Sequence, residues 1–292
     1  MNALQIVSIL IVVLLWGMHF VVMKTNLETF TPFWFLFLRF FFSCFPFILF
    51  VKRPNCSWSL IWRYALLMWV TQLGLLAYGL YQGAPTGLSA LLMQTHAPLT
   101  LIFSFMMFHY RPKTPEVMGL ILALAGIGIV AWTYDAQKLT PLLYVIGAAL
   151  GVALSNLLFK RQSQPINMFA LIVWSSAVAT PIFLMGALVM DGIAPLAAAS
   201  EKLSINLIFT MGYTIILVSL LASTLYAHLI KACEPARVAP FTLLTPVVGI
   251  LAGHWVFDES LTASQYLASG LIIGGLMLNQ WRTLVRRPRI QP

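Results

Sequence analysis

Polar side chains inside long apolar stretches are the residues of this sequence that could do chemistry. A polar group is costly in an apolar medium unless it faces a partner or a water-filled path, so such groups mark a route for a polar substrate. The candidates for this route are Trp16, His19, Gln94, His96, Asn156, Tyr213 and Tyr226. A second interpretation stays open, because Trp and Tyr also anchor helices at membrane surfaces and small hydroxyl groups bond the carbonyls of their own helix.

Arg39 is a further candidate, because it lies eight residues into an apolar stretch and no carboxylate lies inside any stretch. Two roles are open for it: structural support of its helix, or binding of a substrate carboxylate. All eight Asp and Glu residues fall in connections or at the ends of the stretches, so no buried carboxylate can act as a proton switch. Proton coupling would fall to His19, His96 or His228, since histidine titrates near neutral pH, whereas facilitated diffusion needs no such group.

The composition places these residues in a membrane. Of the 292 residues, 60% are hydrophobic and only 9% are charged, and the mean hydropathy is +0.90. A soluble globular domain has about 25% charged residues, so that class is excluded. Stretches of roughly 17 to 25 apolar residues are long enough to cross a bilayer as helices. The ten that we find are Leu4–Met23, Pro32–Val51, Tyr64–Tyr81, Leu88–Phe108, Val117–Thr133, Leu142–Phe159, Met168–Met190, Leu207–Ile230, Val238–Phe257 and Thr262–Trp281. Continuous apolar runs are not barrel strands, which alternate in polarity, so we expect an all-α integral membrane protein with ten transmembrane helices.

The distribution of Lys and Arg predicts the orientation. Thirteen of the seventeen basic residues fall in connections on the same side as the N-terminus, and three fall on the opposite side. The positive-inside rule then predicts that both termini are cytoplasmic. The net charge of +9 is that of a basic face attracted to anionic lipid headgroups, and no aromatic or Gly-rich loop supports binding of nucleic acid.

The chain also repeats itself. Pro98 and Pro246 are 148 residues apart, and the same offset relates Gly126 to Gly274 and Tyr110-Arg111 to Asp258-Glu259. We therefore expect two five-helix repeats, residues 1–136 and 137–292, and an odd number of helices per repeat makes them inverted. Secondary transporters with this design bind substrate near the membrane midplane, with Pro98 and Pro246 as plausible hinges. Glycines four residues apart, Gly249 and Gly253 or Gly270 and Gly274, are expected at helix contacts.

Several motifs, in this order and spacing, resemble those of a known family. They are Trp16–Lys24, Leu38-Arg39-Phe40, Pro85–Leu92, Arg237–Pro240 leading to Thr245–Gly249, Asp258–Thr262 and a Gly-rich tenth stretch. The chain resembles the EamA family of the drug/metabolite transporter superfamily over essentially its whole length. Gln94, Val173-Trp174-Ser175 and the Arg237 segment are most similar to bacterial exporters of cysteine and O-acetylserine. Two positions depart from the family pattern: Tyr110 and Arg111 replace an acidic pair, and His19 replaces a common Asn.

The resemblance implies a secondary transporter of the bacterial inner membrane that exports small amino-acid-like metabolites by alternating access. It also implies a central cavity among helices 1, 3, 4, 6, 8 and 9, with helices 5 and 10 peripheral. The expected partners are a small-molecule substrate and the lipid bilayer, and we expect no metal or other cofactor. A multidrug or other metabolite carrier, and a lipid-linked sugar flippase, stay open as alternatives, as does a homodimer. The sequence has no HExxH or GxSxG motif, so an enzyme is not expected.

Overall fold

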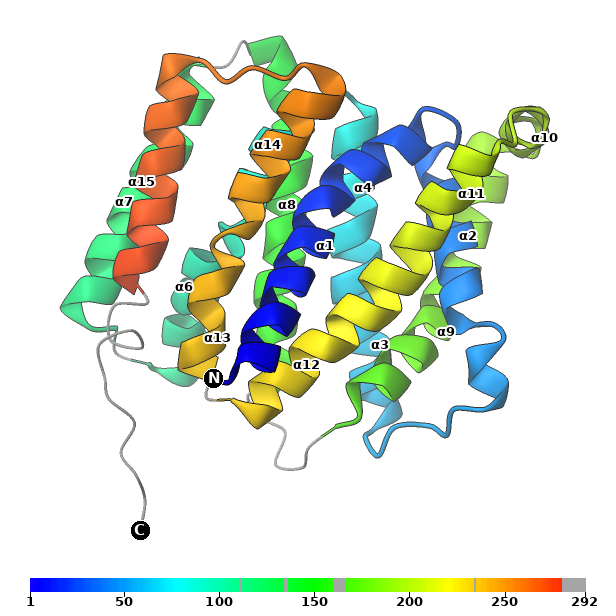
Figure 1. Ribbon diagram of the computed structural model, residues 1–292, viewed down its shortest axis with the longest axis horizontal. Coiled ribbons are helices and arrows are strands. Elements are labelled where there is room, and N and C mark those ends of the chain that lie inside the picture. Colours follow the sequence, from blue (N-terminus) through cyan, green and yellow to red (C-terminus); the bar gives the residue numbers. More distant parts are fainter. Residues whose placement is uncertain (111, 134–135, 160–165, 234, 280–292) are drawn as a thin grey trace.

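The computed structural model describes residues 1–110, 112–133, 136–159, 166–233 and 235–279, and every regular element in these ranges is a helix (Figure 1). Nine helical segments in these ranges are long and apolar enough to cross a bilayer, and Ala263–Leu278 is a shorter, tenth apolar helix. The expected all-α membrane fold with ten spans is therefore confirmed. We call the end of the bundle where the first helix begins the N-side and the opposite end the far side. Which of them faces the cytoplasm stays a prediction.

The spans are built from the following helices. The first five are α1 (Ala3–Leu27); α2 (Pro32–Cys44) with the 3-10 turn η1 (Phe47–Leu49); α3 (Trp58–Tyr64), η2 (Ala65–Leu73) and α4 (Gly74–Tyr81); α5 (Thr86–Met93) and α6 (His96–Phe108); and α7 (Thr114–Thr133). The second five are α8 (Ala136–Phe159); α9 (Met168–Gly186) with η3 (Ala187–Asp191); α11 (Ile205–Gly212), η4 (Tyr213–Ala222) and α12 (Ser223–Ala232); α13 (Pro235–Thr242) and α14 (Thr245–Phe257); and α15 (Ala263–Asn279). Segments η2, η3 and η4 are π-helical, and a short helix, α10 (Ala194–Glu201), joins the seventh and eighth spans.

The fourth and ninth spans, which the sequence presents as single stretches, are each broken into two helices. Pro98 has no amide hydrogen for the carbonyl of Gln94, four residues earlier, and Pro246 likewise has none for the carbonyl of Thr242. The helices therefore end at Met93 and Thr242 and restart at His96 and Thr245. The side chain of Gln94 lies 3.4 Å from the Thr242 oxygen, so its amide meets a carbonyl that Pro246 cannot bond. The two breaks thus meet inside the bundle.

The same two spans are packed on the far side and diverge on the N-side. On the far side, α14 packs against both α5 and α1. Glycines permit this approach, since a Cβ at Gly87 would lie 2.9 Å from the Cα of Ile250, and one at Gly249 would lie 2.5 Å from the Cβ of Ala90. On the N-side, α6 packs against α8, whereas α13 packs against α1 and α12. Among the described residues no substantial contact joins α6 to α13.

The fifth and tenth spans pair with each other at one edge of the bundle, at the left of Figure 1, as the family resemblance implied. A Cβ at Gly275 of α15 would lie 2.6 Å from the carbonyl oxygen of Gly119 in α7. The expectation that Gly270 and Gly274 make this contact is wrong, because a Cβ at either would meet no atom within 4 Å. The sequence pattern identified a glycine-rich helix, but the rotation of that helix selects Gly275.

This packing predicts that Gly275→Ala destabilises the protein and Gly274→Ala, one residue away, does not. The added methyl at Gly275 meets backbone atoms that cannot move aside, and overpacking of this kind costs about 1–3 kcal/mol. Thermal unfolding of both purified variants in detergent measures the difference. Equal melting temperatures would contradict the α7–α15 contact.

Candidate functional site

The predicted pathway residues fall into two groups, and the first surrounds Arg39. The Arg39 side chain is only 2% exposed, and its Nη1 lies 2.6 Å from His19 Nε2. Its Nε and Nη2 donate to Ser219 Oγ at 3.2 and 3.0 Å, and that hydroxyl in turn donates to the Thr214 carbonyl. Because arginine can only donate, His19 Nε2 must accept, so the imidazole proton sits on Nδ1 and the ring is neutral. His19 is therefore poorly placed to carry a proton.

This cluster joins three helices through one buried cation. Arg39 comes from α2, His19 from α1 and Ser219 from η4, which belongs to the second half of the chain. Its three hydrogen bonds all go to neutral side chains, which partly offset the cost of burying the charge. The geometry favours the structural role of Arg39, and binding of a substrate carboxylate stays a prediction. Sequence reasoning missed Ser219, because the π-helical register that turns it toward Arg39 has no sequence signal.

The aromatic candidates lie beside this cluster, between α1 and the eighth span. The rings of Trp16 and Tyr226 are 4.9 Å apart between centroids, and Tyr213 donates its hydroxyl to the Leu15 carbonyl at 2.8 Å. All three side chains are partly exposed. They hold α1 of the first half against the eighth span of the second half, which also fits an interface role, so their place in a pathway stays a prediction.

The second group gathers where the two helix breaks meet. His96 begins α6 and Gln94 precedes it, while Asn156 of α8 lies 3.4 Å from Thr100 Oγ1. The helix stops between Gln94 and His96, because α5 ends at Met93 and α6 begins at His96. Pro98 and Pro246 each lie in the first turn after a break, and their role as hinges stays a prediction.

Unpaired polar atoms concentrate at these breaks. Thr95 Oγ1, His96 Nδ1 and Thr245 Oγ1 are buried without a hydrogen-bond partner among the described residues. Buried polar atoms are usually paired, so each exception calls for a reason. Thr95 and Thr245 stand at the starts of α6 and α14, and helix N-termini carry partial positive charge that favours an anionic group. The meeting point of the breaks therefore has the donors that a small carboxylate requires.

A further cluster, on the far side, was missed by sequence reasoning. Glu259, in the connection after α14, accepts from Lys24 Nζ and from the Thr86 amide, each at 2.9 Å. It also accepts from the Thr86 hydroxyl at 2.9 Å and from the Gly87 amide at 3.0 Å. Lys24–Glu259 is the one ion pair found between described side chains. The Asp258–Thr262 family motif was the available signal, but nothing in it indicates a partner 235 residues away.

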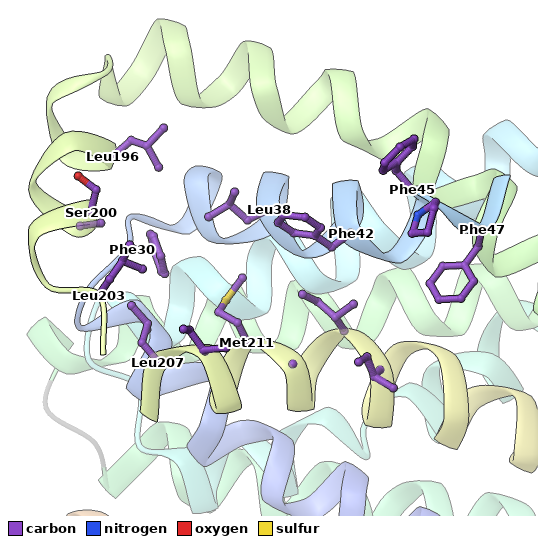
Figure 2. A pocket seen from close by; sticks show the side chains of 16 residues that line it. Phe30, Leu38, Phe42, Phe45, Phe47, Leu196, Ser200, Leu203, Leu207 and Met211 are labelled. Carbon is purple, nitrogen blue, oxygen red and sulfur yellow. The ribbon is translucent and has the colours of Figure 1, made fainter. Parts of the chain in front are cut away.

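A cavity of about 650 Å³ lies between α2, α10, α11 and η4, and no residue of these clusters belongs to its lining. Figure 2 shows Phe30, Leu38 and Leu207 among the side chains around it, and Ser200 is the one polar side chain of its lining. We call it the apolar groove. It offers too few polar partners for a zwitterion and suits an apolar ligand. A smaller cavity of about 340 Å³, on the N-side between α3, η2, α6 and α8, includes Arg63 in its lining.

Among the described residues, no three His, Cys, Asp or Glu side chains are placed to hold a metal ion.

The Arg39 cluster predicts that Arg39→Leu lowers stability. The change leaves His19 Nε2 and Ser219 Oγ with fewer partners, and an unsatisfied buried group costs about 1–3 kcal/mol. Arg39→Lys should fall between Arg39→Leu and the natural protein, since one ammonium has no fork to reach both partners. Thermal unfolding in detergent measures the effect.

The matched control is Ser43→Ala on the same helix, which removes a buried hydroxyl that has no partner among the described residues. It should leave the melting temperature unchanged. An Arg39→Leu variant as stable as the natural protein would contradict the structural role.

Comparisons with known proteins agree with this architecture. A sequence model of the EamA-like transporter family matches residues 3–132 and again 139–281, although the division at residue 136 stays a prediction. The chain is 30% identical to a probable amino-acid metabolite efflux pump of Escherichia coli, over 95% of this chain and 96% of that protein. It is 23% identical to an uncharacterized inner membrane transporter of the same organism, over 91% and 87% of the two chains. One crystal structure shares the fold, with a TM-score of 0.59 and 13% identity over 98% of this chain and all of the other. The chain is therefore a multi-pass membrane transporter, not an enzyme, and belongs to the EamA-like transporter family.

Proposed function

We propose that this protein exports small amino-acid-like metabolites, of the cysteine and O-acetylserine type, across the bacterial inner membrane by alternating access. The observation that carries the substrate class is the match, over nearly the whole chain, to a probable amino-acid metabolite efflux pump. The name of the inner membrane transporter among the relatives supports the location. The N-side faces the cytoplasm in this proposal, because most Lys and Arg residues belong to connections on that side.

The proposed substrate site is the meeting point of the two helix breaks. A zwitterionic amino acid needs donors for its carboxylate and acceptors for its ammonium group. The first turns of α6 and α14, together with Thr95 and His96, supply donors. The side-chain oxygen of Gln94 and the carbonyl of Thr242 supply acceptors. The Arg39 cluster supports the site by holding α1, α2 and η4 together.

The divergence of α6 and α13 supports alternating access. In this proposal the described conformation receives substrate from the N-side, because the fourth and ninth spans pack against each other on the far side and, among the described residues, have no substantial contact on the N-side. Rocking of the two halves about the Pro98 and Pro246 regions would close the N-side and open the far side. Inverted repeats provide two such states of similar energy.

Export should fall when the breaks lose their polar groups. We expect Gln94→Ala and His96→Ala each to reduce transport roughly tenfold, because a hydrogen bond to a charged group contributes about 1.5–3 kcal/mol. Liposomes containing the purified variant and labelled cysteine, O-acetylserine, threonine or homoserine measure this rate. Thr180→Ala is the control, because the Thr180 hydroxyl bonds only a carbonyl of its own helix among the described residues. Normal transport by both variants, with none of the four substrates affected, would contradict the site.

A multidrug carrier is the second candidate, and the apolar groove is the observation that favours it. Its lining of aromatic and aliphatic side chains suits a hydrophobic substrate. A lipid-linked sugar flippase would also use a groove open to lipid, and several lining residues such as Phe42 and Ile208 are exposed on the outside of the bundle.

Gly212→Phe separates these candidates. Gly212 lines the groove and a Cβ there would meet no atom within 4 Å, so a phenyl ring can fill the groove without a backbone clash. If the protein exports amino-acid-like metabolites through the helix breaks, Gly212→Phe should leave the transport of these metabolites unchanged. The matched control is Gly128→Phe on the exposed face of α7, where the space is equally open. Loss of transport in Gly212→Phe alone would favour the groove as the substrate path.

A further inference from the structure

The Glu259 carboxylate joins the two halves of the chain at the far side. It belongs to the connection after α14, in the second half, and all of its side-chain partners belong to the first half. Its oxygens accept the first amides of α5, where the partial positive charge of the helix lies, and the ammonium of Lys24 at the end of α1. The same ammonium stands 4.5 Å from the centre of the Phe257 ring. One side chain thus ties α1, α5 and α14 together.

The packing around the Glu259 carboxylate is tight. A Cβ at Gly253 of α14 would fall against the hydroxyl of Thr86 and the carboxylate of Glu259. One turn into α5, Ser89 is fully buried. On the far side, α5 and α14 are therefore closely packed, and the charged Glu259 lies at the outer end of this contact.

Among the described residues, the position in the first repeat that corresponds to Glu259 holds no carboxylate. Asp258 and His109 end α14 and α6 in the same left-handed conformation, with φ of 51° and 52°, so Glu259 corresponds to Tyr110. This structural offset is one residue longer than the offset between Pro98 and Pro246. Tyr110 donates its hydroxyl to Glu116 within its own loop. The next residue, Arg111, lies outside the described residues.

We propose that Glu259 and Lys24 form a latch that closes the far side of the transport path and favours the far-side-closed state. The proposal rests on alternating access as proposed above. Opening toward the far side must break the ion pair and expose the first turn of α5. The latch therefore acts on the equilibrium between the two conformations rather than on substrate contacts.

The latch should hold across the physiological pH range. Burial alone would raise the pKa of the Glu259 carboxyl, but hydrogen bonds from Thr86, Gly87 and Lys24 lower it below the ordinary glutamate value. A lowered pKa stabilises the latched state above the ordinary value of about 4.3 and loses that effect only as the pH falls through the lowered pKa. The other charged or titratable groups at this point are Lys24, Asp258 and His254, whose ring meets the Glu259 backbone carbonyl. Acidification from about pH 8 to about pH 5.5 should not open the far side.

Cysteine accessibility tests the latch without any substrate. In a background lacking Cys44, Cys56 and Cys233, one reporter is Ser89→Cys, behind the latch, and the other is Asn156→Cys, exposed near the N-side end of α8. Reaction with a membrane-impermeant maleimide is followed in vesicles of each orientation. We expect Glu259→Gln to raise labelling of the Ser89→Cys reporter roughly tenfold, a typical conformational coupling, and to lower labelling of the Asn156→Cys reporter. Lys24→Met is the second variant and should act in the same direction.

Glu201→Gln is the matched control, because this acid is exposed at the end of α10 on the far side, and it should change neither reporter. Opposite changes of the two reporters support the latch. Unchanged labelling would overturn it, and so would a parallel rise of both reporters, which indicates general loosening. Loss of protection of the Ser89→Cys reporter at pH 5.5 would also overturn it. Because labelling needs no substrate, failure of amino-acid export in liposomes with reciprocal labelling intact would reject the proposed function and keep the latch.

Discussion

Two missing amide hydrogens, at Pro98 and Pro246, are the constraint on which the rest of this arrangement depends. Inside hydrocarbon a backbone carbonyl has no water to bond, so a proline that frees one must be matched by another donor. The chain meets this demand across its own pseudo-symmetry, where the Gln94 amide approaches the Thr242 carbonyl. The cost of breaking two helices thereby creates a polar point at the centre of an apolar bundle. Polar atoms that a continuous helix would keep at its surface, such as Thr95 Oγ1, become available there.

The two repeats share a backbone plan but differ in their charges. Both end their fourth helix in the left-handed conformation, at His109 and at Asp258. The next residue is Tyr110 in one and Glu259 in the other, and only the carboxylate can accept from a helix N-terminus and a lysine at once. Hydrogen bonds to a charged group contribute about 1.5–3 kcal/mol each, more than neutral ones. A carrier with inverted repeats has two mirror-related states, and a difference of this size at one end is enough to favour one of them.

Cavity size and chemistry point to different places in this protein. The apolar groove is larger than the N-side cavity but offers one polar side chain, whereas the helix breaks offer polar atoms that lack partners. The buried cation at Arg39 is hydrogen-bonded to His19 of α1 and Ser219 of η4 and not to residues of the breaks. A charge inside a membrane protein is therefore no sufficient marker of a substrate site, because neutral partners from two other helices can support it.

Composition and hydropathy alone were enough to establish ten helices, since a hydrocarbon layer permits few other structures for such a chain. Pro98 and Pro246 also lie where the fourth and ninth spans break, although each span is one continuous apolar stretch in the sequence. Other features were decided only in three dimensions. Which glycine of α15 meets α7 depends on helix rotation, so Gly275 could not be told from Gly274 by spacing. Ser219 lies 180 residues from Arg39 in the sequence, and Lys24 lies 235 residues from Glu259. No local sequence pattern encodes such pairings. Sequence specifies what each segment must bury, whereas packing of the segments against one another determines which polar groups meet.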